Sequence, residues 1–123
     1  MTLNWDQKVI ELTMNDFDYW IERFDALMVE IYAPWCGHCK EFVDKYNDVG
    51  QQLFDSAPRY FVAKIDGHKY PEIVKRYELK GYPSLIFFKR GKPVVYDGEM
   101  KAKLIVDYVK KHGPENVQLL DCG

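Results

Sequence analysis

Residues 26–33 read ALMVEIYA, a nearly continuous apolar run with one charged residue, Glu30, inside it. A β-strand gives such a run when both of its faces are covered, because neither side chain row then meets water. We therefore predict a buried central strand at 26–33. The rest of the chain is expected to supply the layers that cover it.

Strand patterns and helix patterns alternate along the remaining chain. Besides 26–33, the residues favour strands at 8–12, 60–66, 84–88 and 93–97, and helices at 17–24, 36–54, 70–77 and 99–111. Gly91 suits a tight hairpin turn between the last two strands. The order β-α-β-α-β-α-β-β-α predicts an α/β fold with a largely parallel centre, closed by that hairpin.

Length and composition restrict the classes of protein that fit. A chain of 123 residues predicts one domain, long enough to bury a core without disulfides. The net charge is −2 and no basic patch stands out, which argues against nucleic acid as a partner. Because no apolar run approaches the length of a membrane span, we expect no membrane contact. A monomer is the expected state.

Neither end of the given sequence matches a targeting signal that we recognise. Residues 1–12 lack the basic start and apolar run of a signal peptide, and residues 115–123 match no retention tetrapeptide. A cytosolic protein, a mature chain and one domain of a longer multidomain protein all fit these ends. We favour the third, with 1–123 as one domain whose core spans about 8–114, because the ends lie close to the expected domain edges.

The chain has three cysteines, two of them in the sequence CGHC at 36–39 and the third at Cys122. An odd count argues against a disulfide scaffold. A zinc site needs a second pair of ligands, and the remaining candidates are scattered. Covalent haem needs a histidine after the second cysteine, where this chain has Lys40. A redox couple is favoured over a structural disulfide, because the domain does not need the covalent link.

The two cysteines of this motif are expected to differ. Cys36 follows the buried strand and opens a helix, whose free N–H groups and dipole favour a thiolate. A charged His38 would add to that stabilisation. Cys39 continues the apolar helix stripe through Phe42 and Tyr46, so its sulfur is expected to face the core, where burial opposes ionisation. We predict one exposed, activated sulfur beside one buried, less reactive sulfur, the arrangement that disulfide exchange needs.

Two charged residues lie within apolar strand patterns. Glu30 and Lys64 would be costly there unless they were paired, protonated or exposed at a strand edge. On adjacent strands the two side chains could meet. The alternative for each is a solvent-exposed face of its strand. Pro83, in the sequence GYPSL, comes just before a predicted strand.

Four segments together resemble a known family. APWCGHCK, VAKID, KGYPSLIFF and VKKHGP occur in the order typical of the catalytic, thioredoxin-like domains of the protein disulfide isomerase family, and the match runs from about Lys8 to Pro114. The resemblance implies a thioredoxin-like fold, with a central mixed β-sheet flanked by helices. It also implies a thiol–disulfide oxidoreductase or isomerase that acts on client proteins.

The resemblance also assigns roles to individual residues. It makes Cys36 the attacking thiol and Cys39 the resolving thiol. The other implied catalytic positions are Gly37, His38, a buried pair formed by Glu30 and Lys64, and a cis-proline at Pro83, while Trp35, Gly81 and Tyr82 would bind substrate.

The resemblance further implies a setting for this chemistry. No bound cofactor or metal is expected beyond the Cys36–Cys39 disulfide itself. That disulfide would exchange with glutathione or a partner oxidase. The implied compartment is the lumen of the endoplasmic reticulum.

The chain departs from the family pattern before its last helix. Met100 takes the place of the family's usual arginine in an ungapped comparison, and Lys101 is its neighbour. Cys122 belongs to no motif. Two other functions stay open: a cytosolic thioredoxin-type reductase, and a chaperone or adaptor module without enzymatic activity. His38 favours the more oxidising couple of the isomerase over that of the reductase.

Overall fold

The computed structural model of the chain describes residues 8–114. The elements in this part of the chain are β1 (Val9–Leu12), α1 (Phe17–Arg23), β2 (Ala26–Tyr32), α2 (Gly37–Asp55), β3 (Phe61–Asp66), α3 (Pro71–Arg76), β4 (Ser84–Lys89), β5 (Lys92–Tyr96) and α4 (Ala102–His112). This is the predicted order of strands and helices. Together with the five-stranded mixed sheet described below, it confirms the predicted fold class.

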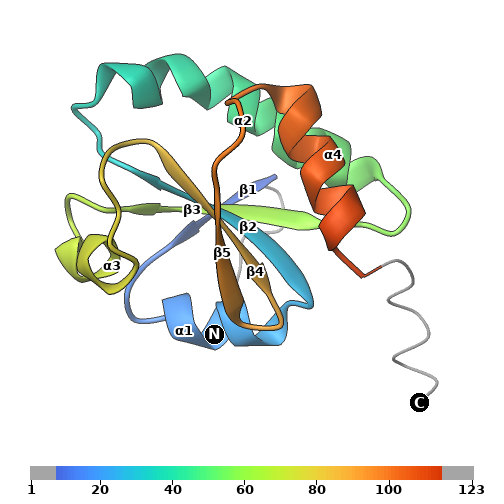
Figure 1. Ribbon diagram of the computed structural model, residues 1–123, viewed down its shortest axis with the longest axis horizontal. Coiled ribbons are helices and arrows are strands. Elements are labelled where there is room, and N and C mark those ends of the chain that lie inside the picture. The colour runs from blue at the N-terminus through green and yellow to red at the C-terminus, as the bar shows by residue number, and fades with distance from the viewer. Residues whose placement is uncertain (1–7, 115–123) are drawn as a thin grey trace.

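The five strands form one mixed sheet in the order β1-β3-β2-β4-β5. Strands β1 and β2 both pair with β3 in parallel, whereas β4 pairs with β2 and with β5 in antiparallel fashion. The predicted apolar run at 26–33 thus becomes β2, the central strand. Figure 1 shows that α2 and α4 cover one face of this sheet, while α1 and α3 lie on the other.

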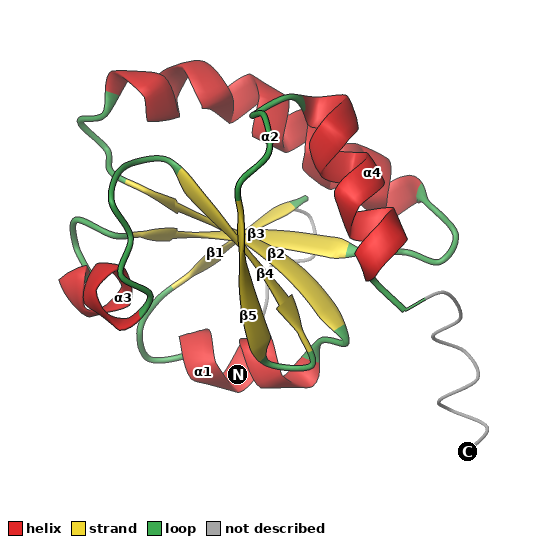
Figure 2. Cartoon of the chain, viewed as in Figure 1, coloured by secondary structure: helices red, strands yellow, loops and turns green. Residues whose placement is uncertain are grey.

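Alternation along β2 explains why its sequence is apolar throughout. Leu27, Val29 and Ile31 belong to the core beneath α1 and α3, whereas Met28 belongs to the core beneath α2 and α4. Glu30 has the same parity as Met28 and so lies on the α2 and α4 face. Figure 2 shows the helices on both sides of the strands. Because both faces are covered, the strand has no solvated row of side chains.

The hairpin between β4 and β5 turns at Arg90 and Gly91. Both have positive φ, 52° and 82°, as the two central residues of a type I′ turn require. Glycine adopts this backbone without strain, which confirms the predicted turn position. The last helix begins at Ala102 rather than at 99, because the preceding segment is a loop whose Glu99 carbonyl accepts a hydrogen bond from the Tyr96 hydroxyl, 2.7 Å away.

Two features are absent from the described residues. None of the helices within 8–114 is long and apolar enough to cross a membrane. In the same part of the chain, no three histidine, cysteine or acidic side chains lie close enough together to hold a metal ion.

Candidate active site

The CGHC segment lies where β2 leaves the sheet and α2 begins. Cys36 is the N-cap residue of α2, and its sulfur accepts a hydrogen bond from the Cys39 N–H, 3.2 Å away. The first turn of a helix has N–H groups without partners in the helix, and here one of them points at the Cys36 sulfur. Negative charge on that sulfur is favoured by this bond and by the dipole of the 19-residue helix.

Both cysteines are free thiols and both are buried. Cys36 is 7% exposed and Cys39 is 4% exposed, so the predicted contrast between an exposed and a buried sulfur is wrong for Cys36. The loop before β4 covers it: the Cys36 thiol donates to the Tyr82 carbonyl, 3.7 Å away. Cys39 faces inward as predicted. The two cysteines therefore differ in the groups that surround them, whereas their solvent exposure is nearly the same.

Cys39 is held in its protonated form. Two causes above all raise the pKa of the Cys39 thiol to about 12: burial, which is the larger, and the hydrogen bond with Cys36. At pH 7 only about one molecule in 100,000 would then carry a Cys39 thiolate, since each pKa unit is a factor of ten. Any reaction in which Cys39 attacks needs a base close to it.

A row of charged residues crosses the sheet below α2. In the strand register, Glu11 on β1 is opposite Lys64 on β3, and Lys64 is opposite Glu30 on β2. All three have the parity of the residues that face α2. Burial decreases along the row from the centre of the sheet to its edge. Glu30 is 5% exposed, whereas the side chains of Lys64 and Glu11 are 31% and 42% exposed.

Glu30 is a buried acid with a strongly shifted pKa. Burial raises the pKa of its carboxyl group to about 7, even though the positive charge of Lys64 opposes the shift. The exposed-edge alternative for Glu30 is therefore wrong. Glu30, Cys39 and Lys64 line the same cavity of about 120 Å³, which reaches from the sheet to the start of α2. A carboxyl group that changes its charge near neutral pH thus shares a cavity with the thiol that needs a base.

Lys64 has a partner that the sequence did not suggest. Its ammonium nitrogen lies 3.8 Å from a carboxylate oxygen of Glu11, and the structure has no ion pair of that kind between Lys64 and Glu30. Lys64 therefore lies next to Glu30, as predicted, but forms its ion pair with Glu11. The Tyr32 hydroxyl donates to both Glu11 oxygens, at 3.1 and 2.9 Å.

Aromatic and loop residues form the outer side of the site. Trp35 is 61% exposed and packs edge-on against Tyr82, with ring centroids 5.7 Å apart. The peptide bond between Tyr82 and Pro83 is cis. A side chain added at Gly37 or Gly81 would meet nothing within 4 Å, so the space beside both glycines is open. Trp35, Tyr82 and the two glycines thus border the side of the motif that holds Cys36.

His38 and Met100 lie on one side of that surface. They line a hollow of about 280 Å³ together with Pro83 and residues of α2. The His38 ring extends into solvent, with Nδ1 3.9 Å from a Glu41 carboxylate oxygen. Lys101 is not among the residues that line this hollow, and it forms an ion pair with Glu99 at 3.1 Å.

Comparison with known proteins decides the family of the chain. The family model for thioredoxin matches residues 8–111. The chain belongs to the thioredoxin family. Among curated relatives of this thioredoxin-family chain, mouse protein disulfide-isomerase A4 is 36% identical over 112 residues, which are 90% of this chain and 18% of that protein. Drosophila melanogaster protein disulfide-isomerase is 38% identical over 110 residues, 89% of this chain and 22% of that protein.

A solved structure agrees with these relatives. The first thioredoxin domain of mouse protein disulfide-isomerase A4 superposes with a TM-score of 0.82 at 34% identity, over 89% of this chain and 79% of that one. The predicted resemblance to the disulfide isomerase domains is confirmed. The chain spans about a fifth of the length of the curated relatives that it matches.

The structure of this thioredoxin-family chain brings most of the predicted site residues together. Cys39 shares one cavity with Glu30 and Lys64. On the other side of the motif, His38 shares a hollow with Tyr82 and Pro83, and the Cys36 thiol donates to the Tyr82 carbonyl. Glu11 was missed, although the polar residue inside the strand VIEL was a visible signal. Cys122 lies outside the described residues.

Proposed function

We propose that this domain is a thiol–disulfide oxidoreductase that forms, reduces and rearranges disulfides in client proteins through Cys36 and Cys39. One observation carries the proposal: the Cys36 sulfur is the hydrogen-bonded N-cap of α2, while Cys39 shares a cavity with Glu30. A structural disulfide would need neither a base behind one cysteine nor a helix N–H directed at the sulfur of the other.

The first step is an attack by Cys36. The Cys36 thiolate attacks one sulfur of a client disulfide, forms a mixed disulfide, and displaces the other client sulfur as a thiolate that takes a proton from water. The Cys39 N–H and the α2 dipole stabilise the attacking charge. The open space beside Gly37 and Gly81 admits the client chain, and Trp35 and Tyr82 supply apolar surface to hold it.

The second step is release by Cys39. Its thiol gives a proton to the Glu30 carboxylate, directly or through water in the shared cavity. The Cys39 thiolate then attacks the Cys36 sulfur, the Cys36–Cys39 disulfide forms, and the client leaves as a thiolate. The client has gained two electrons and the cysteine pair has lost two. The reverse sequence oxidises a client dithiol.

We place this activity in the lumen of the endoplasmic reticulum, with glutathione or a partner oxidase regenerating the couple. The similarity to protein disulfide-isomerases supports this setting. The position of His38 between the two cysteines supports the oxidising direction, because a positive charge added to this segment would favour a Cys36 thiolate and so the reduced form. No cofactor beyond the two cysteines enters either step.

Insulin reduction by the purified domain tests the proposal. We expect the wild type and Cys122→Ser to reduce insulin at equal rates and Cys36→Ser to be inactive. Cys122→Ser is the matched control, since it removes a thiol outside the motif. An inactive wild type would leave the adaptor alternative, and activity that survives in Cys36→Ser would overturn the assignment of the nucleophile.

Equilibration with glutathione buffers separates the isomerase from the reductase. We expect a potential near −180 mV, about the value of protein disulfide isomerase, rather than about −270 mV as in thioredoxin. His38→Pro should make the couple more reducing by about 30 mV or more. A wild-type value near that of thioredoxin would contradict the proposed direction, and an unchanged value in His38→Pro would remove its basis in His38.

A further inference from the structure

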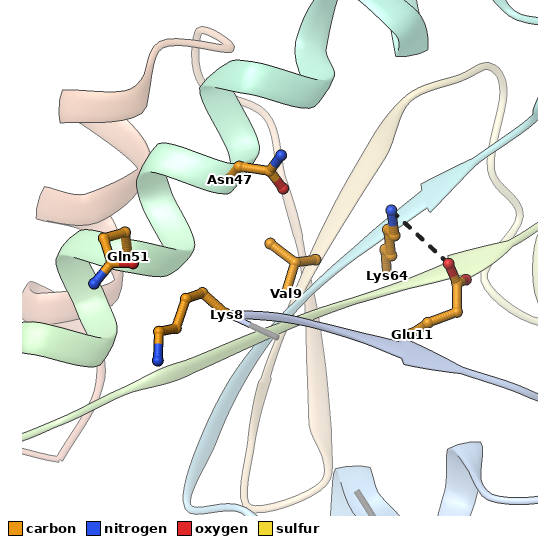
Figure 3. A pocket seen from close by; sticks show the side chains of 6 residues that line it. All are labelled: Lys8, Val9, Glu11, Asn47, Gln51 and Lys64. Atoms are coloured by element: carbon orange, nitrogen blue, oxygen red, sulfur yellow. Dashed lines mark ion pairs between the residues drawn. The ribbon is translucent and has the colours of Figure 1, made fainter. Parts of the chain in front are cut away.

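Lys64 stands between two hollows of the molecule. The inner one is the cavity of about 120 Å³ that contains Glu30 and Cys39. The outer one, of about 360 Å³, lies at the edge of the sheet between β1 and α2, and Glu11 lines it. Figure 3 shows this outer hollow, with Lys64 and Glu11 pointing toward each other and with Asn47 and Gln51 on α2. Two carboxylates, one in each hollow, therefore flank a single ammonium group.

We propose that Glu11 is a positioning residue for the release step: it binds the Lys64 ammonium at the edge of the sheet and so controls how much of that positive charge reaches Glu30. The inference rests on the proposed function, in which Glu30 takes the proton of Cys39. The geometry that carries it is the ion pair of 3.8 Å and the register that places Lys64 between the two acids.

The Tyr32 hydroxyl fixes the position of Glu11. It donates to both carboxylate oxygens, and this holds an otherwise half-exposed side chain against Lys64. Tyr32 and Glu30 lie on the same strand, β2, so the hydroxyl ties the edge strand to the strand that carries the base. A surface glutamate without such a bond would lose much of its attraction for lysine to solvent and side chain entropy.

Two effects of Glu11 act on Glu30 in the same direction. The negative charge of Glu11 lies two strand spacings away, about 10 Å, and disfavours a second carboxylate. Glu11 also draws the ammonium toward the edge, and this weakens the attraction that would ionise Glu30. Both effects keep the Glu30 carboxyl protonated to higher pH, which agrees with the direction in which Glu11 acts on the pKa of Glu30.

Other titratable groups also face this row, and a test must hold them constant. The groups around Glu30 and Glu11 are Lys64 and Asp66 from β3, Tyr32 from β2, Cys39, Lys40 and Tyr46 from α2, Lys8 at the rim of the outer hollow, and Lys69 from the loop after β3. A substitution at Glu11 leaves all of these side chains in the protein, and Lys64 and Tyr32 are the ones that bind Glu11 directly. Glutamine there keeps an oxygen that can accept the Tyr32 bond and removes only the charge.

The direct test is an NMR titration of the Glu30 side chain carboxyl carbon in the reduced domain, without substrate. We expect Glu11→Gln to lower the midpoint by about one pH unit, the size of a charge effect at this separation. Glu11→Asp, which keeps the charge, should stay close to wild type. Glu22→Gln is the matched control, because it removes one exposed negative charge on α1, on the opposite face of the sheet.

The pH profile of client release from the Cys36 mixed disulfide should move to lower pH by the same amount in Glu11→Gln. A Glu30 midpoint that is unchanged in Glu11→Gln, or that moves equally in Glu22→Gln, would overturn the inference. These failures differ from failure of the proposed function. An inactive wild type in the insulin assay would overturn the function, whereas normal activity with an unmoved midpoint overturns only the role of Glu11.

Discussion

The outer and inner sides of the CGHC segment consist of different kinds of residue. The outer side has exposed Trp35, a loop with a cis-proline, and two glycines with open space beside them. The inner side has a buried acid, a half-buried lysine and a cavity. Cys36 belongs to the first region and Cys39 to the second, although only two residues separate them in the chain.

The comparison shows that the different roles proposed for the two sulfurs do not come from a difference in their solvent exposure. Both are buried to nearly the same degree. Cys36 receives a helix N-terminal N–H, which stabilises its charge, whereas Cys39 faces an acid that can accept its proton. In the proposed mechanism the outer region therefore supports attack on a client, and the inner region supports release. Substitutions can separate these two activities.

The largest expected separation comes from Cys39→Ser. Attack by Cys36 should continue, while release is lost, because a serine hydroxyl cannot form the Cys36–Cys39 disulfide. Mixed disulfides with a client should therefore accumulate, as nonreducing gels would show. If Cys39→Ser instead abolished the formation of mixed disulfides, the outer region could not act alone and the comparison would fail.

Glu30→Gln should affect only the inner region. Without a base, we expect release to slow about a hundredfold, the low end of what general-base catalysis contributes. Alkylation of Cys36 by iodoacetamide should keep its wild-type rate. Stopped-flow measurement of release, paired with the alkylation assay, checks both. Equal slowing of the two reactions would mean that Glu30 supports the fold of the site rather than proton transfer.

Glu30 should also make stability depend on pH. Its pKa is about 7 in the folded protein against 4.5 for the free group, so the folded state keeps a proton that the unfolded state loses. Its contribution to stability is therefore complete below pH 4.5 and is lost as the pH rises through 7. That interval corresponds to as much as about 3 kcal/mol.

Urea unfolding at pH 4.5 and pH 8 measures this difference. Between the two values, wild type should lose more free energy of unfolding than Glu30→Gln, by up to about 3 kcal/mol, because glutamine stays neutral throughout. Parallel curves for the two proteins would show that Glu30 is not protonated in the fold, and the proton-accepting role of the inner region would lose its basis.

The smallest effect is expected at Met100, on the outer side. An arginine there would bring a permanent charge to the hollow beside His38 and Pro83, which a thioether cannot supply. Met100→Arg should speed release about fivefold, because a permanent positive charge favours the Cys39 thiolate. Fivefold is the effect of about 1 kcal/mol, the energy between two charges close together in water. Lys101→Ala should change little, since Lys101 is exposed and paired with Glu99.

Stopped-flow reoxidation of wild type, Met100→Arg and Lys101→Ala decides between the two residues. A much slower reoxidation of Lys101→Ala, with Met100→Arg at the wild-type rate, would show that Lys101 serves Cys39. The ion pair of Lys101 with Glu99 would then not keep it from that role. If the three proteins behave alike, neither residue serves Cys39, and the inner region must handle the proton by itself.

The fold was predictable from the sequence because its signals are local or periodic. The apolar run of β2, the stripe of α2 and the turn at Gly91 each identify an element without knowledge of the others. The resemblance then implied a mixed sheet flanked by helices, whereas the order of the strands within that sheet came from the structure. The start of α4 was misplaced by a few residues, because the segment before it forms a loop held by the Tyr96 hydroxyl.

The site was less predictable, because it depends on register between strands that are distant in sequence. Lys64 and Glu30 were expected to pair, yet the ion pair goes to Glu11 on the third strand of the row. The burial of Cys36 was also missed, since it results from a loop more than forty residues away that folds over the sulfur. Neither contact leaves a pattern near the cysteines.

The central claim is that Cys36 alone attacks the client while Cys39 waits protonated behind it. The most direct measurement mixes the reduced wild-type domain with a peptide disulfide, quenches with acid after milliseconds, and maps the peptide adduct by mass spectrometry. We predict that the adduct forms on Cys36 and decays as the Cys36–Cys39 disulfide appears. An early adduct on Cys39, or equal adducts on both cysteines, would contradict the division between the outer and inner regions.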